Sequence, residues 1–261
     1  MRTILLVLSA FVSTSLPATE RFAPETPVLN VGAEEIRAER LKEFQFTWIQ
    51  VIEQNDEWVE RGSYSESLKK DDMKLRHEQI ISLPGDRSIN TVTDFDAKTL
   101  FVNSVVRNIT SGSPDRPSRI EIHYGDDGYS QRVTLGNGEQ SESSLHTAVK
   151  PFASQAFGLV ISALPLETDY RARLPVAFPQ LQMWYWIELV VVDEITVQYK
   201  GRDVELFVVD AHWMNVSDGS VYPGGKDQSG GQYHIVKDGG GDLPHVWRYM
   251  SEHVDIRPAG I

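Results

Sequence analysis

The 261-residue sequence contains no cysteine, and this absence excludes several classes of protein. Without cysteine there is no disulfide bond, no cysteine-ligated zinc or iron–sulfur centre and no thiol nucleophile. A lipobox cysteine for acylation is missing for the same reason. A chain without cysteine is also indifferent to an oxidising compartment, so it fits a periplasm as well as an extracellular space.

Positive charge is scarce relative to negative charge. The chain has 25 lysines and arginines against 37 aspartates and glutamates, which gives a formal net charge of −12. Nucleic acid requires clustered basic side chains on its phosphates, and an anionic membrane surface repels a protein of negative charge. The charge therefore argues against both as partners, whereas a basic partner protein is compatible with it. A hydrophobic content of 41% indicates a globular rather than a disordered chain.

Motifs for catalysis, metal binding and phosphate binding are also missing. No serine stands in a G-x-S-x-G elbow, no H-E-x-x-H occurs, and no two histidines have the i,i+4 spacing of a helical zinc site. The glycines at 224–225 precede Lys226, but no strand–loop–helix pattern of a P-loop surrounds them. From motifs alone we predict no catalytic residue, no metal ligand and no cofactor.

Long apolar runs are absent except for a short one at the N-terminus. Residues 4–12 form a mostly apolar run of nine residues that follows Arg2 and precedes small residues up to Ala18. This pattern is typical of a secretory signal peptide, and the run is too short to span a bilayer. We predict a signal peptide at 1–18, cleaved after Ser15 or Ala18. The mature protein is then periplasmic or secreted, without a transmembrane segment.

From Phe44 onward, the apolar residues follow the period of two that β-strands require. Phe44, Phe46 and Trp48 would share one face of a strand, and Ile195 and Val197 alternate with polar residues in the same way. Turn signals separate further expected strands at 73–83, 88–95, 100–110, 119–125, 128–135 and 140–146. Strands this frequent, joined by short turns, predict an antiparallel sheet rather than alternating strand–helix units.

One segment breaks this period. Residues 151–164 begin with a proline, which a helix tolerates in its first turn, and are apolar nearly all round. We therefore predict one helix at 151–164 that is buried against the sheet and ends at Pro165. Residues 19–43 are expected to form an extended leader with a short helix or an irregular segment at 33–43. Residues 44–261 are expected to form a single β-rich domain.

Three short segments resemble a group of secreted bacterial proteins of unknown function. They are residues 94–100 (DFDAKTL), residues 157–166 (FGLVISALPL) and the late hairpin that contains 192–194 (VDE) and 199–202 (YKGR). The strands of that group curl into a half-barrel similar to that of the lipoprotein carriers LolA and LolB, whose family binds acyl chains. The resemblance implies a mainly β fold, a curved antiparallel sheet or half-barrel with one buried helix packed on it. The missing lipobox cysteine departs from the acylated members and argues against a membrane anchor.

Large aromatic side chains are the most informative candidate site residues. Trp184 and Trp186 would lie on one face of a strand, where aromatics on a concave sheet can line an apolar pocket. Phe157, Leu159 and Val160 of the expected helix would complete this wall. We predict these five residues as ligand-binding positions that act as apolar wall and not as reactive groups. The alternative is that they form the core beneath the helix, since a large sheet must bury one face in any case.

Three functional hypotheses remain open. The first is a non-enzymatic carrier for a hydrophobic or lipid-like ligand, which a dry pocket of roughly several hundred Å³ would favour. The second is an envelope protein-interaction scaffold whose partner meets an edge strand or the loop at 215–231. The third is a hydrolase with a site, or a metal, near Asp210, His212 and His234. Strand histidines near a loop are more often surface or satisfied polar residues.

Overall fold

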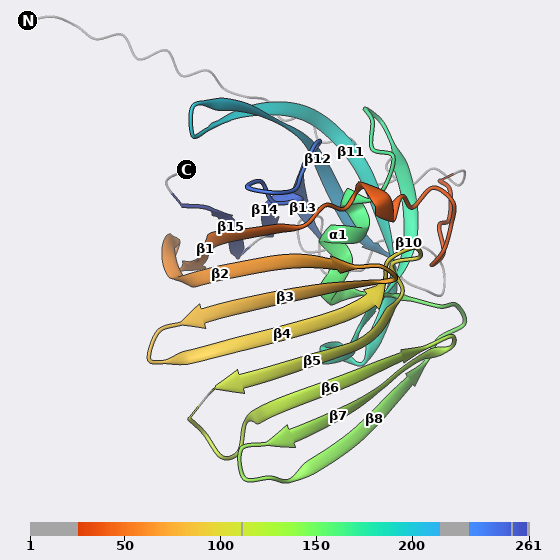
Figure 1. Cartoon of the computed structure of the whole chain (residues 1–261). Coiled ribbons are helices and arrows are strands. Elements are labelled where there is room, and N and C mark those ends of the chain that lie inside the picture. Colours follow the sequence, from red (N-terminus) through yellow and green to blue (C-terminus); the bar gives the residue numbers. More distant parts are fainter. Residues whose placement is uncertain (1–25, 111, 215–229, 252, 260–261) are drawn as a thin grey trace, which may run out of the picture.

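The computed structural model describes residues 26–110, 112–214, 230–251 and 253–259. Within these residues, fifteen strands form one open sheet, in the order β8-β7-β6-β5-β4-β3-β2-β1-β15-β14-β13-β12-β11-β10-β9 (Figure 1). The predicted signal peptide at 1–18 and most of the loop at 215–231 lie outside the described residues. In the described part of the chain, no helix is long and apolar enough to cross a membrane.

The first eight strands form a continuous antiparallel meander. They are β1 (Phe44–Gln54), β2 (Glu57–Asp71), β3 (Lys74–Leu83), β4 (Arg87–Asp96), β5 (Val102–Thr110), β6 (Pro117–Gly125), β7 (Gly128–Leu135) and β8 (Gln140–His146). The turn between β1 and β2 is tight because Asn55 and Asp56 adopt positive φ, of 54° and 63°. The expected strands between 73 and 146 are thereby confirmed.

The remaining strands continue the sheet on the other side of β1. They are β9 (Phe152–Ala153), β10 (Arg171–Phe178), β11 (Met183–Tyr199), β12 (Arg202–Met214), β13 (Gly230–Val236), β14 (Val246–Ser251) and β15 (Val254–Pro258). The long hairpin of β11 and β12 turns at Lys200 and Gly201, both at positive φ, as the sequence predicts. β15 pairs with β1 and so joins the two halves. The prediction of a mainly β, curved antiparallel fold is confirmed.

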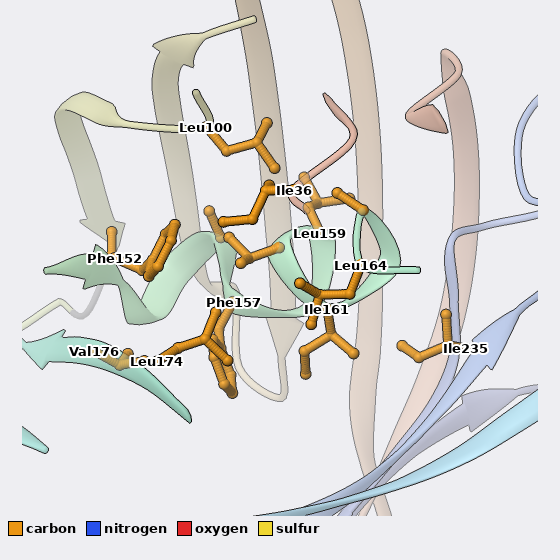
Figure 2. Close-up of a cluster of buried hydrophobic side chains, with 14 of the residues drawn as sticks. Ile36, Leu100, Phe152, Phe157, Leu159, Ile161, Leu164, Leu174, Val176 and Ile235 are labelled. Atoms are coloured by element: carbon orange, nitrogen blue, oxygen red, sulfur yellow. The ribbon is translucent and has the colours of Figure 1, made fainter. Parts of the chain in front are cut away.

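The sheet curves around the helix α1 (Phe157–Ser162), which lies inside the curve (Figure 1). We call the face toward α1 the concave face and the opposite face the convex face. Buried apolar side chains gather around α1, as Figure 2 shows, with Ile36 and Leu100 on one side of the helix, Leu174 on a second side and Ile235 on a third. The hydrophobic core therefore lies between the helix and the concave face.

The helix is shorter than the sequence predicts. A 3-10 turn, η3 (Ser154–Ala156), precedes α1, and Phe152–Ala153 form β9, which pairs in parallel with Val176 and Ala177 of β10. The expected start at 151 is therefore wrong, although the helix is buried and packed on the sheet as predicted. The physical reason is that the edge of β10 offers hydrogen-bond partners to the backbone of residues 152–153, which favours an extended conformation.

Residues that precede β1 cover the rest of the β10 edge. The amide of Leu29 donates to the carbonyl of Arg173 at 2.9 Å, and the amide of Arg173 donates to Pro27 at 2.8 Å. Within 33–43 the only helical element is one 3-10 turn, η2 (Ala38–Arg40). The Arg40 guanidinium donates to the Leu164 carbonyl at 2.7 Å, just beyond the C-terminal end of α1, where a cation is favourable. This segment thus holds the helix in place.

Candidate binding cavity on the concave face

The structure places Trp184 and Trp186 on the convex face. In β11, Ile187 stands opposite Leu174, which is part of the core around α1 in Figure 2. Because side chains alternate along a strand, Trp184 and Trp186 point to the other face from Ile187. The two indoles contact each other with ring centroids 5.7 Å apart, and both are half-buried. Ligand binding at these two residues stays a prediction.

The three predicted residues of the helix lie in the core. Phe157, Leu159 and Val160 are all buried, and the Phe157 ring meets Tyr233 edge-on with centroids 5.9 Å apart. Leu159 also lines a cavity between α1 and the concave face. The structure therefore separates the five predicted residues into a convex pair and a core group, and only Leu159 of the five borders this cavity.

The cavity has a volume of about 160 Å³ and is partly open to solvent. Its walls come from three parts of the chain. They are Trp48, Tyr64, Glu66, His77 and Gln79 of β1–β3; Ser154, Gln155, Ala156, Gly158 and Leu159 of the helical segment; and Tyr233, Val246, Tyr249 and Ile256 of β13–β15. Sites for drug-sized ligands measure roughly 300–1,000 Å³, so this cavity encloses only part of a lipid-like molecule. The walls are also more polar than an apolar pocket would be.

Strand register explains how these polar residues reach the cavity. Across β1 to β4, Phe46, Glu66, Gln79 and Thr91 stand at directly opposed positions and so share the concave face. The helix comes close on the other side because residue 158 is glycine. A Cβ added at Gly158 would lie 2.7 Å from Cγ2 of Val246, which is closer than real Cβ contacts. Small size at this position thus sets the distance between α1 and β14.

A buried histidine and a buried glutamate form the most enclosed polar part of the wall. Nε2 of His77 and Oε1 of Glu66 are hydrogen-bonded, and the two residues are only 1% and 7% exposed. Nδ1 of His77 and Oγ1 of Thr93, which stands opposite His77, are buried and have no hydrogen-bond partner within the described residues. Such buried unpartnered atoms are rare because each costs about 1–3 kcal/mol. This part of the concave face is therefore polar although it is buried.

Tyrosines give the cavity both apolar surface and hydroxyl groups. Tyr233 and Tyr249 pack with ring centroids 4.8 Å apart, and Tyr64 accepts a hydrogen bond from Gln79. Burial raises the pKa of Tyr64, Tyr233 and Tyr249, so these phenols remain neutral hydrogen-bond donors at physiological pH. The cavity therefore combines aromatic walls with donors that do not ionise.

The residues of the hydrolase hypothesis lie elsewhere, on the convex face. Gln232 stands between two of them: its amide donates to Asp210 at 3.0 Å, and its carbonyl oxygen lies 3.1 Å from Nε2 of His234. His212 stands opposite Glu188 on β11. Burial lowers the pKa of His234, which favours its neutral form. Within the described ranges, no group of three His, Cys, Asp or Glu side chains could hold a metal ion.

Sequence reasoning missed the polar residues of the cavity, although a weak signal is present. Serines at 63, 65 and 67 of β2 alternate with Tyr64, Glu66 and Leu68, so the larger side chains share one face. When one of the alternating residues of a strand is a glutamate, its face normally points to solvent. No residue near β2 in the sequence shows that a helix will cover this face. The cavity also needs β2 and β13–β15 together, which are distant in sequence.

Comparison of this chain with protein-family models, with curated proteins and with solved structures finds no match. The resemblance to the half-barrel of LolA and LolB therefore stays a prediction. Function must be inferred from the cavity and from the residues that surround it.

Proposed function

We propose that the protein is an exported, non-enzymatic binding or carrier protein for a hydrophobic or lipid-like ligand of the cell envelope. The ligand would enter the cavity between α1 and the concave face. The observation that carries the proposal is the two-sided wall of this cavity. Leu159, Ala156 and Ile256 offer hydrocarbon, whereas Gln79 and the tyrosines offer hydrogen-bonding groups. Such a wall suits an amphipathic molecule better than a purely apolar or purely polar one.

An apolar strip extends from the cavity across the sheet. Tyr64 of the cavity wall stands opposite Ile81, Ile81 opposite Ile89, and Ile89 opposite Ile109. The three isoleucines are only half-buried, so they present hydrocarbon to the concave side. Adjacent strands are about 4.8 Å apart, so the strip extends roughly 14 Å from Tyr64. A chain that is too long for the cavity can lie along this strip, where each buried methylene contributes about 0.8 kcal/mol.

Export is the part of the proposal that rests on the predicted signal peptide. The test is the mass of the mature protein isolated from its own host. Loss of the first 15 or 18 residues supports export, and a full-length chain in the cytoplasm contradicts it.

Ligand binding is tested with two probes of equal chain length, dodecanoate and dodecanol, in a titration followed by tryptophan fluorescence. Trp48 lines the cavity and reports on its occupation. Ser154→Phe places a ring in the cavity and is expected to abolish binding. The matched control is Ser144→Phe, which places the same ring at an exposed position of β8. Unchanged binding in the Ser154 variant would place the ligand elsewhere, and no binding by the wild type would contradict the proposal.

Native mass spectrometry of the protein purified without detergent identifies the natural ligand. A discrete added mass that is lost on denaturation supports the carrier function and gives the ligand class. A bare polypeptide mass that stays unchanged after incubation with envelope lipids contradicts it.

A second candidate function is an envelope protein-interaction scaffold. Leu181, just before β11, and Met183, its first residue, are 47% and 41% exposed. Exposed apolar side chains that cluster in this way are typical of protein contact surfaces. Under this candidate neither probe binds, and Met183→Lys removes an envelope protein that co-purifies with the wild type without changing the melting temperature.

A further inference from the structure

We propose that Arg107 binds the anionic headgroup of the ligand, so that the site prefers amphipathic anions to neutral molecules of the same chain length. The inference rests on the proposed function, because it names the ligand class of the same site. The ligands of this class carry a carboxylate or a phosphate group on an apolar chain.

The strand register places Arg107 on the concave face next to the cavity. Arg107 stands opposite Thr91, which stands opposite Gln79 of the cavity wall. On its other side Arg107 stands opposite Ile120 of β6. The residue two positions along the strand is Ile109, at the end of the apolar strip. The Arg107 side chain therefore lies between the polar wall and the hydrocarbon of the strip.

Arg107 has no counter-ion in the described part of the chain. Its Nε donates a hydrogen bond to Oγ1 of Thr91 at 3.2 Å, and neither an ion pair nor a hydrogen bond of its two terminal nitrogens is present there. Three convex-face arginines differ in this respect, because each pairs with a carboxylate: Arg76 with Asp94 at 3.2 Å, Arg119 with Glu121 at 2.9 Å and Arg132 with Glu142 at 2.8 Å. The two terminal nitrogens of Arg107 are thus available to bind a carboxylate or phosphate group of a ligand.

The surroundings of Arg107 make an unpaired cation unfavourable. Burial lowers the pKa of the Arg107 guanidinium, which shows that the site disfavours its charge. An arginine nevertheless stays charged at neutral pH because its usual pKa lies far above 7. The nearest acid in the same cross-strand row is Glu66, three strands away at roughly 14 Å by strand spacing, and it is bonded to His77. An anionic group from a ligand would offset this cost.

Two tyrosines complete the surroundings of the guanidinium. Burial raises the pKa of Tyr64 and Tyr124, and the charge of Arg107 lies close enough to both phenols to offset part of that rise. The Tyr124 hydroxyl donates to Oε1 of Gln155 at 3.2 Å, and Gln155 lines the cavity. Arg107 is therefore at the junction of the cavity and the strip. A planar guanidinium fork binds carboxylate and phosphate in a bidentate geometry.

The test compares dodecanoate, dodecyl phosphate, dodecanol and inorganic phosphate on the wild type and on Arg107→Gln. We expect the wild type to bind both anionic amphiphiles at least tenfold more tightly than dodecanol. Arg107→Gln should lose this preference while its affinity for dodecanol stays unchanged. The matched control, Arg132→Gln, removes an arginine from the convex face and should leave all affinities as in the wild type. Arg107→Lys keeps the charge without the fork and should retain part of the preference, provided its melting temperature equals that of the wild type.

The outcomes separate this inference from the proposed function. Equal binding of dodecanoate and dodecanol by the wild type overturns the role of Arg107 and leaves the carrier function standing. An anion preference that persists in both Arg107→Gln and Arg107→Lys also overturns the role of Arg107 and leaves the carrier function standing. Binding of inorganic phosphate that depends on Arg107, without binding of any amphiphile, supports an anion site but contradicts the carrier function. If no probe binds, both are overturned.

Discussion

Replacement of Leu159 by alanine tests whether the cavity beneath α1 exists as described. Leu159 is 2% exposed and lines the cavity, whereas Ile161 of the same helix is fully buried and does not line it. Removal of three carbon atoms from Leu159 loses about 2.4 kcal/mol of transfer free energy at about 0.8 kcal/mol for each. A residual void of about 40 Å³ would add about 1 kcal/mol. We therefore expect Leu159→Ala to lower the free energy of unfolding by about 3 kcal/mol.

The comparison with Ile161→Ala gives the prediction its specificity. Space next to Leu159 is already partly open to solvent, so water can enter the enlarged void. Ile161 has no such neighbour, and its replacement should cost nearer to the upper end of the usual range, about 4–5 kcal/mol. Urea unfolding at constant m-value measures both, with the exposed Leu181→Ala as a control expected within about 0.5 kcal/mol of the wild type. A cost for Leu159→Ala equal to or above that for Ile161→Ala would refute the reasoning.

Three further changes test the fold and the site. Burial lowers the pKa of His234 and His245, so the unfolded chain binds protons more readily than the folded protein. The free energy of unfolding should therefore fall as the pH drops below about 6.5, which urea midpoints between pH 8 and 5 measure. His234→Gln should make this fall with pH less steep. Gly158→Val brings side-chain atoms against Val246 and should cost about 1–3 kcal/mol in the same assay. The control is Gly125→Val, because a Cβ added there makes only an ordinary contact of 3.8 Å with Asp127, and it should cost less. Trp184→Ala should leave dodecanoate affinity unchanged if the ligand binds at the concave face, and a tenfold loss would restore the convex tryptophans as the site.

The strands could be predicted because their signals are local. Alternation of apolar and polar residues and the turn residues between them place β3 to β8 within two residues of their observed bounds. The start of the helix could not be predicted in the same way. Residues 152–153 are apolar and suit a helix, but β10, which follows them in the chain, offers an edge to which they bind. The competing interaction is not visible in the segment itself.

When both faces of a strand are apolar, the strand itself can be predicted from the sequence, but which face points to the core is harder to predict. In β11 one set contains Trp184 and Trp186, and the other contains Tyr185, Ile187 and Leu189. Alternation shows that the two tryptophans share a face but not which face it is. Only the pairing of Ile187 with Leu174 decides the question, and that pairing depends on the whole sheet.

The polar residues of the concave face are themselves an argument for a bound molecule. Glu66, His77, Thr93 and Arg107 occupy positions where a sheet that only packs against a helix would carry apolar side chains. Two of them leave buried polar atoms without partners in the described residues, and Arg107 has no counter-ion there. Replacement of such groups by apolar residues of similar size is often neutral or stabilising, so packing alone does not explain them. An amphipathic anion would satisfy the cation and cover the adjoining strip of isoleucines at once, which is the arrangement that the proposed ligand class requires.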